Sequence, residues 1–195
     1  MISNNEYYEL TIEHRNQHKC GGYPFENGQF LTDIVQELRS ENILEIGTSI
    51  GYSTNCFARA FDTVKITTID KDKTHCELAT KNFKENNVID QVEILFGVSG
   101  KIIKDLKIDN KKYDIIFFDG FSPNPDEVDD YIELLNNSGL LITTNLELPS
   151  KIYRVDEYLD KILKLGSTTI RFGDIAFSSK DKTKLEICKK LWGST

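Results

Sequence analysis

The sequence of 195 residues is poor in several residue types, and each shortage excludes a class of protein. Four cysteines stand far apart without a CxxC pair, so we expect reduced thiols, as in a cytoplasmic protein, and no disulfide framework. Four prolines and twelve glycines are too few for a disordered or collagen-like chain. No apolar run approaches the roughly 20 residues of a membrane helix, and the start, MISNNEYYEL, does not resemble a signal peptide.

Basic residues are also in deficit. The chain has 24 lysines and arginines against 31 aspartates and glutamates, which gives a formal net charge of −7. Proteins that bind nucleic acid usually carry a basic excess, because neutralisation of phosphates drives their affinity. The densest lysine cluster, within residues 101–112, has the spacing of a solvated helix face followed by a loop. A nucleic-acid partner is therefore not favoured.

Short apolar runs alternate with longer helical patterns along the first three quarters of the chain. The predicted strands are 43–46, 64–69, 92–96, 113–118 and 140–144. The helical patterns are about 29–39, 53–61, 74–86, 99–106 and 126–136. Such alternation predicts a parallel sheet with right-handed crossovers and helices on both faces. The run YDIIFF, at 113–118, is apolar at successive positions, which is typical of a buried central strand.

The end of the chain follows a different pattern. A helical stretch near 152–164 is followed by STTIRF and DIAFSS, and so short a link around Gly173 forces an antiparallel hairpin. The last stretch places Leu185, Cys188, Leu191 and Trp192 on one helical face. We expect Trp192 to pack against the body of the protein; a subunit contact is the alternative.

Two features point to a ligand site at the carboxyl ends of the strands, where open α/β sheets bind ligands. Gly47 and Gly51 frame the loop after the first strand, and Asp70 ends the second strand. The glycines permit a tight turn and close approach of the backbone, although the spacing is GxxxG and not GxGxxG. A carboxylate at Asp70 can accept both hydroxyls of a ribose. A solvent-facing capping aspartate is the alternative.

The strings ILEIGTSIGYST, TIDKD and YDIIFFDG resemble class I S-adenosylmethionine-dependent methyltransferases. The string LEIGTSIGYS is most similar to the catechol and caffeoyl-coenzyme A O-methyltransferase group, and VEILFGVSGKII and FGDIAFSSK extend the likeness over about residues 25–180. The resemblance implies an α/β, Rossmann-like, seven-stranded sheet of order 3-2-1-4-5-7-6, with strand 7 antiparallel and helices on both faces. It implies one methyltransferase domain, made of an N-terminal segment covering the site (1–28), a core (29–180) and a C-terminal helix (181–195). A homodimer is compatible with it.

The resemblance also assigns cofactor-binding residues for S-adenosylmethionine. Asp70 would hold the ribose hydroxyls, Ser99 would lie at the adenine, and Asp119 would face the reactive side. The methionine part would be surrounded by residues of the first strand and its loop: Glu45, Gly47, Ser49, Gly51, Tyr52 and Ser53. The segment PFENGQF would lie over the methionyl end, with Glu26, Asn27 and Gly28 nearest.

The metal site of the catechol-type enzymes is incomplete in this chain. Asp119 and Asn145 match two of the three expected metal ligands, but Thr144 replaces the expected aspartate, so the affinity for Mg²⁺ should fall. The general-base lysine expected about three residues after Asp119 is absent as well. Use of a divalent metal is thus left open. Either Glu147 supplies the missing carboxylate, or Asp119 acts directly as the catalytic residue, with Asn145 beside it.

The resulting hypothesis is methyl transfer from S-adenosylmethionine to a hydroxyl, or an amine, of a small-molecule acceptor. The alternatives are a tRNA-nucleoside methyltransferase, to which the fragment DGFSPNPDEV has a short likeness, a cofactor-binding protein without catalysis, and a nicotinamide-dependent oxidoreductase. The residues His14, His18 and Cys20 form an HxxxHxC pattern that lacks a fourth metal ligand, so we expect a surface or mobile segment there. His75 is expected on a helix surface; a place near the adenine is the alternative.

Overall fold

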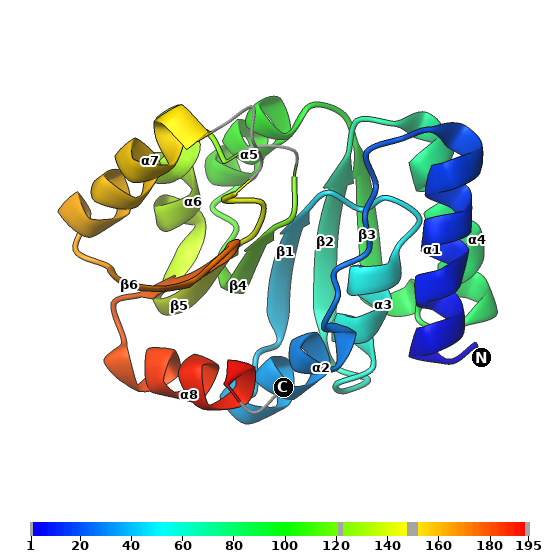
Figure 1. Ribbon diagram of the computed structural model, residues 1–195, viewed down its shortest axis with the longest axis horizontal. Coiled ribbons are helices and arrows are strands. Elements are labelled where there is room, and N and C mark those ends of the chain that lie inside the picture. Colours follow the sequence, from blue (N-terminus) through cyan, green and yellow to red (C-terminus); the bar gives the residue numbers. More distant parts are fainter. Residues whose placement is uncertain (1, 121–122, 148–151, 194–195) are drawn as a thin grey trace.

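The computed structural model describes residues 2–120, 123–147 and 152–193. Their strands form one seven-stranded sheet of order β3-β2-β1-β4-β5-β7-β6, which confirms the predicted order (Figure 1). The strands are β1 (Asn42–Ile46), β2 (Lys65–Asp70), β3 (Val92–Phe96), β4 (Tyr113–Phe118), β5 (Leu135–Thr143), β6 (Thr168–Phe172) and β7 (Ile175–Ser179). The first five pair in parallel, and β7 is antiparallel to both β5 and β6, as expected.

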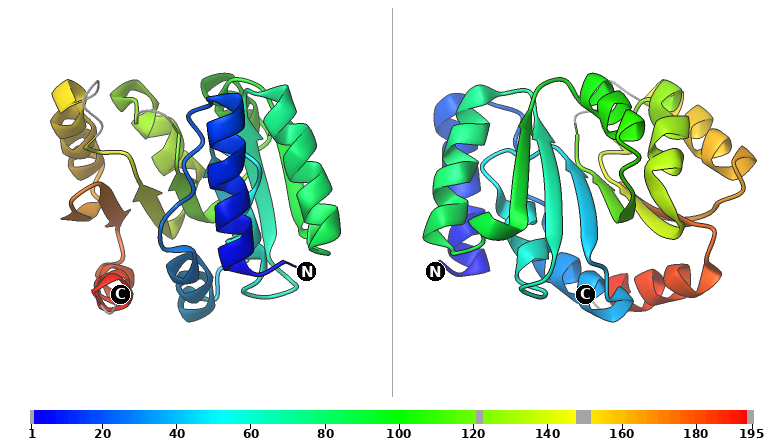
Figure 2. Two further views of the ribbon diagram at one scale, coloured as in Figure 1. Left: turned by 45° about the vertical axis from the view of Figure 1, so that its right-hand side comes forward. Right: turned by 180° about the vertical axis from the view of Figure 1, so that it is seen from behind.

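Helices cover both faces of the sheet, as predicted. They are α1 (Asn4–His18), α2 (Gly28–Leu38), α3 (Tyr52–Ala58), α4 (Lys73–Glu85), α5 (Ser99–Ile108), α6 (Val128–Leu134), α7 (Ile152–Lys164) and α8 (Lys182–Trp192). One hydrophobic core joins the sheet to α2, α3, α4 and α8, with Tyr7 and Tyr8 of α1, and the other joins it to α5, α6 and α7. Figures 1 and 2 show α2 and α8 on the side of the sheet opposite to α5, α6 and α7. No helix of the described residues has the length and apolar character to cross a membrane.

The central strand β4 explains why its sequence is apolar at successive positions. It lies between β1 and β5, so both of its faces are covered. Ile115 and Phe117 belong to the core beneath α2, α3 and α8, whereas Ile116 and Phe118 belong to the core beneath α5, α6 and α7. This alternation is the normal geometry of a strand, because successive side chains point to opposite faces.

Two elements differ from the sequence-based prediction. Strand β5 begins at Leu135 and not at residue 140, and a bulge separates the pairs Tyr113–Leu135 and Ile115–Leu140. The polar stretch 136–139 occupies this bulge, so strand propensity did not indicate it. The helix expected at 126–136 is divided into the 3₁₀ turn η2 (Pro125–Glu127) and α6, and a second 3₁₀ turn, η1 (Ile89–Gln91), precedes β3.

Both ends of the chain contribute side chains to the same hydrophobic core. Residues 4–18 form α1, which the hydrophobic pattern did not reveal because only Tyr7, Thr11 and His14 are buried. A capping box between Ser3 and Glu6 starts this helix. At the other end, the Trp192 ring lies 5.2 Å from the Phe30 ring and 5.9 Å from the Phe177 ring, measured between centroids. The expectation that Trp192 packs against the body is confirmed.

Candidate functional site

The candidate site lies at the carboxyl ends of β1, β2, β4 and β5, where the strand order reverses between β1 and β4. Backbone hydrogen bonds continue past the strand ends and hold the loops in place. The N–H of Gly47 donates to Ile69 O at 2.9 Å, and that of Asp119 donates to Ile46 O at 2.9 Å. The N–H of Thr144 donates to Phe118 O at 3.0 Å. The predicted site residues of the four strands therefore meet along one edge.

The loop after β1 requires glycine at two positions, because of its backbone conformation and its close neighbours. Gly47 has a φ of 105°, and a Cβ at this position would lie 2.7 Å from the carbonyl oxygen of Asp119. Gly51 has a φ of 96°, and its Cβ would lie 2.4 Å from the Phe83 ring. Ser49 between them also adopts a left-handed conformation, with a φ of 48°. The loop thus places Ser49 close to Asp70 at the end of β2 and Gly47 against the backbone of Asp119.

Asp70 is fixed by hydrogen bonds on both of its oxygens. Its Oδ2 accepts the N–H of Ser49 at 2.8 Å and lies 3.4 Å from Nδ1 of His75. Its Oδ1 accepts the N–H of Asp72 at 2.8 Å. Burial alone would raise the pKa of Asp70, but the hydrogen bonds from His75 and the two N–H groups hold that pKa below its ordinary value. The carboxylate is therefore charged and oriented.

Glu45 is wholly enclosed beneath the loop. The hydroxyls of Ser53 and Thr54 donate to its carboxylate, and the Thr68 hydroxyl donates at 2.7 Å. Burial raises the pKa of Glu45 to about 7 in spite of these hydrogen bonds. Its oxygens are thus occupied by hydroxyls from α3 and β2, and the side chain joins β1 to both elements.

Asp119 at the end of β4 is paired with the two residues that follow β5. The Thr144 hydroxyl donates to Oδ1 of Asp119 at 2.6 Å, and Nδ2 of Asn145 donates to the same oxygen at 3.3 Å. Among the described residues, none donates to Oδ2. Burial raises the pKa of Asp119 to about 7 although both donors lower it. The structure thus brings together all three positions at which the resemblance places metal ligands.

These residues do not fit the hard divalent cation of the catechol-type site. Such a cation needs several oxygen ligands, whereas Thr144 uses its hydroxyl as a donor to Asp119. The Asn145 amide nitrogen also faces inward, toward Asp119 and toward Gly120 O at 3.0 Å. Glu147, the candidate replacement, extends toward the β6–β7 hairpin, where its Oε1 lies 3.7 Å from Nη2 of Arg171. The set therefore offers one carboxylate where the catechol-type site has two.

The N-terminal segment lies over the glycine loop. The Tyr7 hydroxyl donates to Ile50 O at 2.7 Å. A Cβ on Gly22 would lie 2.4 Å from Oγ of Ser49, and one on Gly28 would lie 2.2 Å from the Tyr52 hydroxyl. The Ser49 hydroxyl is buried and has no hydrogen-bond partner. The segment 19–28 thus passes directly over the loop, and the unpaired Ser49 hydroxyl lies beneath Gly22.

The remaining predicted positions lie at the rim of the site. Ser99 is the first residue of α5, after β3, and is half-buried. Asn27 caps α2, because its Oδ1 accepts the Phe30 N–H at 3.0 Å. Within the fragment DGFSPNPDEV, Phe121 and Ser122 lie outside the described residues.

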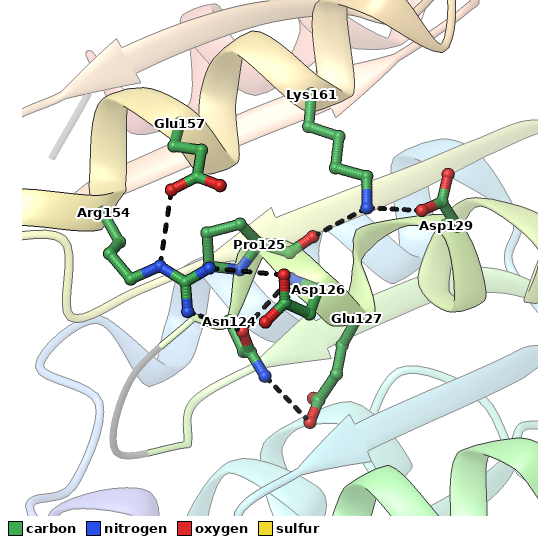
Figure 3. Close-up of polar contacts among 8 residues, drawn as sticks. All are labelled: Asn124, Pro125, Asp126, Glu127, Asp129, Arg154, Glu157 and Lys161. Carbon is green, nitrogen blue, oxygen red and sulfur yellow. Dashed lines mark hydrogen bonds and ion pairs between the residues drawn. The ribbon is translucent and has the colours of Figure 1, made fainter.

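The described end of that fragment is bound to α7 by a polar network (Figure 3). Arg154 of α7 contacts Oδ1 of Asp126 at 3.3 Å and Oδ1 of Asn124 at 3.4 Å. Two turns further along, Lys161 donates to Pro125 O at 3.1 Å and pairs with Asp129. These contacts fix one end of the loop that follows Asp119.

Two histidines differ from the sequence-based expectation. His75 is 8% exposed and His14 is 7% exposed, so neither lies in a surface or mobile segment. The reason is that α1 packs beside α4, as Figures 1 and 2 show, and the two rings lie 5.2 Å apart between centroids. His18 stacks on His14 at 4.4 Å. The spacing HxxxHxC did not indicate the partner from α4, because 60 residues separate His14 from His75.

Comparison with known proteins identifies the family. The O-methyltransferase family profile matches residues 5–176. The chain belongs to the O-methyltransferase family. This membership confirms the resemblance seen in LEIGTSIGYS. The matched residues include the whole candidate site, from Glu45 to Asn145.

Individual members of the family show how much is shared. Catechol O-methyltransferase of Niastella koreensis is 32% identical over 120 residues, which cover 60% of this chain and 54% of that protein. Catechol O-methyltransferase of Mycobacterium tuberculosis is 29% identical over 100 residues, covering 51% and 44%. The chain thus spans about half the length of the curated relatives it matches. The O-methyltransferase structure from Bacillus cereus, in complex with S-adenosylhomocysteine, shares the fold at a TM-score of 0.78 and 20% identity, covering 92% of each chain.

Proposed function

We propose that this member of the O-methyltransferase family binds S-adenosylmethionine and transfers its methyl group to a hydroxyl of a small-molecule acceptor. The observation that carries the proposal is the arrangement around Asp70. Its carboxylate is charged and held by the N–H groups of Ser49 and Asp72, at the strand end where α/β folds bind a ribose. The buried, unpaired Ser49 hydroxyl beside it supports a polar ligand at this point.

We assign the remaining residues by their place along the edge. Gly47, Ser49 and Gly51 form a backbone cradle for the methionine part, which Tyr52 and Ser53 adjoin at the start of α3. Glu45 supports this cradle from below through Ser53. Ser99 lies at the adenine end, because it follows β3, the neighbour of β2 on the side away from Asp119.

Asp119 acts as the proton acceptor in this proposal. When bound, S-adenosylmethionine supplies an electrophilic methyl group, and the protein contributes orientation and a site for the proton. Thr144 and Asn145 both donate to Oδ1 of Asp119, which leaves Oδ2 to accept the proton of an acceptor hydroxyl. An amine acceptor could use the same oxygen. No metal enters this scheme, because Thr144 takes the place of a carboxylate ligand.

The proposal is tested by calorimetric titration of the full chain with S-adenosylhomocysteine. Asp70→Asn should weaken binding roughly 10- to 100-fold, since a hydrogen bond to a charged group contributes about 1.5–3 kcal/mol. Asp62→Asn is the matched control, because Asp62 is exposed in the turn before the same strand. Equal affinity of the wild type and Asp70→Asn would overturn the assignment. No binding by the wild type would overturn the proposed cofactor.

Turnover is measured separately, with radiolabelled S-adenosylmethionine and a panel of hydroxylated aromatic acceptors. Addition of Mg²⁺ should leave turnover unchanged, and Asp119→Asn should lower kcat while leaving the affinity for S-adenosylhomocysteine within a few-fold. A strict requirement for Mg²⁺ would refute the metal-free scheme. Tight cofactor binding with no turnover on any acceptor would favour a cofactor-binding protein without catalysis. A homodimer and a cytoplasmic location stay predictions.

A further inference from the structure

A second cluster of reactive side chains lies beside Asp70, at the carboxyl ends of the strands, but takes no part in the proposed reaction. His14 of α1, Cys20 just after α1, and His75 in the first turn of α4 each place a potential ligand atom within 4.8 Å of the others. It is the one such group of His, Cys, Asp and Glu side chains found in residues 2–120, 123–147 and 152–193. Two separate segments of the chain therefore converge on one point.

The His14 side chain provides independent evidence for a ligand. The residue is 7% exposed, and its buried Nε2 has no hydrogen-bond partner. An unpaired polar atom in the interior costs roughly 1–3 kcal/mol, so buried nitrogens of this kind are nearly always satisfied by a partner, a water or an ion. In this cluster, a Cys thiol and a second imidazole lie beside the His14 imidazole. Imidazole nitrogen and thiolate sulfur are the ligand types that Zn²⁺ takes in proteins.

The surroundings of His75 match those of a metal-binding histidine. Its Nδ1 lies 3.4 Å from Oδ2 of Asp70, so Nε2 is the nitrogen available to the cluster. Histidines that bind metals commonly donate their other ring N–H to a carboxylate, which sets the tautomer and the ring orientation. Asp70 is itself fixed by the N–H groups of Ser49 and Asp72. The backbone N–H groups thus orient Asp70, and Asp70 orients the His75 ring.

The dimensions of the cluster also suit a small ion. Zinc bonds of about 2.0–2.3 Å in a tetrahedral site hold neighbouring ligand atoms roughly 3.5 Å apart. The ligand atoms here lie within 4.8 Å, so small side-chain rotations bring them to that separation. Oxygen-seeking cations are disfavoured, because none of the three ligands is an oxygen.

We propose that His14, Cys20 and His75 bind a Zn²⁺ ion, with water or an external ligand in the fourth position. The ion would join α1 and the segment after it to the start of α4. Because the segment 19–28 passes over Ser49, the ion would also hold this segment in place above the glycine loop. The metal site itself does not depend on the proposed methyl transfer, and its test uses no cofactor.

The test is titration of the metal-free full chain with Co²⁺, a spectroscopic substitute for Zn²⁺. We expect one Co²⁺ per chain, visible d–d absorption of a tetrahedral site and a thiolate charge-transfer band in the near ultraviolet. Cys20→Ser should abolish the charge-transfer band, and His14→Gln and His75→Gln should each weaken binding by at least about tenfold. His18→Gln is the matched control, because His18 stacks on His14 but lies outside the cluster. It should bind Co²⁺ like the wild type.

A second measurement needs no variant and so does not depend on the folding of one. Zn²⁺ should protect Cys20 from alkylation in the wild type, as seen by mass spectrometry, whereas the metal-free chain should be labelled there. Alkylation of Cys20 at the same rate with and without Zn²⁺ would overturn the proposal. A charge-transfer band that persists in Cys20→Ser, or equal loss of binding in His18→Gln, would overturn it as well.

Discussion

The replacement Glu45→Gln should change how the stability of the protein depends on pH. Glu45 is completely buried, and burial raises the pKa of its carboxyl from the ordinary 4.5 to about 7, despite three hydroxyl donors. Because the folded protein binds this proton more tightly than the unfolded chain, the proton stabilises the fold below about pH 4.5. That contribution is lost as the pH rises through 7, so stability should fall with increasing pH.

The size of the effect follows from the two pKa values. One unit of pKa corresponds to about 1.4 kcal/mol, so the full change between the acid and alkaline limits is roughly 3 kcal/mol. Between pH 5 and pH 8 roughly 2–3 kcal/mol of it should appear. Glutamine carries no titrating group, and the Ser53 hydroxyl can accept a hydrogen bond from its amide. The variant should therefore lack this component and equal or exceed the wild type in stability at pH 8.

The assay is urea unfolding without cofactor at several pH values, followed by tryptophan fluorescence and circular dichroism. The quantity of interest is the free energy of unfolding of the wild type minus that of Glu45→Gln. Burial also raises the pKa of Asp119 to about 7. Because Asp119 is present in both proteins, its contribution to the pH dependence largely cancels in this difference. Glu37→Gln on the exposed face of α2 controls for the substitution itself. If the difference between wild type and Glu45→Gln is constant from pH 5 to pH 8, the reasoning is wrong.

Three further predictions concern packing, and urea unfolding at one pH checks each. Gly47→Ala should cost at least about 2 kcal/mol, because of its left-handed backbone and the Asp119 carbonyl 2.7 Å from the new Cβ; Gly166→Ala, also left-handed but with open space around it, should cost only about 1 kcal/mol. Equal costs would show that the contact with Asp119 is unimportant. Trp192→Ala should cost about 2–3 kcal/mol, because the contacts of the indole with three phenylalanine rings are lost. This cost is below that of a fully buried ring because Trp192 is only half-buried, and a cost near zero would place the indole in solvent. Tyr7→Phe should cost about 1 kcal/mol, since it removes one buried hydrogen bond to a carbonyl that a second donor still satisfies, and a cost above about 3 kcal/mol would contradict this account.

The parts of the fold that could be predicted are those in which local pattern and tertiary packing agree. The run YDIIFF is buried on both faces, and the sheet places it in the centre, where such a run belongs. Gly47 and Gly51 form the tight turn that the sequence indicates, and both do so with positive φ angles. Thr144 was recognised as a departure from the metal-binding pattern, and the structure adds that its hydroxyl is a donor to Asp119.

The parts that could not be predicted depend on contacts between distant segments. Helix α1 buries few side chains, so its sequence has no clear apolar face, and its docking through Tyr7 is a tertiary event. The burial of His14 and His75 follows from that docking, because each ring covers the other. The bulge in β5 belongs to the same class, since the polar stretch 136–139 has low strand propensity and only the residues on either side of it, Leu135 and Leu140, pair with β4.

The position of β7 has a consequence for the order in which the protein is completed during synthesis. Leu141, Ile142 and Thr143 of β5 pair with residues of β7, which emerges after β6 although it lies between β5 and β6. A nascent chain whose first 165 residues have emerged from the ribosome can assemble the first five strands, but its outermost strand then presents an open, apolar edge to any neighbouring chain. In the finished protein that edge is covered, and the new outer strand β6 is short and exposes Thr168 and Arg171. Chains stopped before β7 should consequently aggregate, whereas chains that include it should remain dispersed.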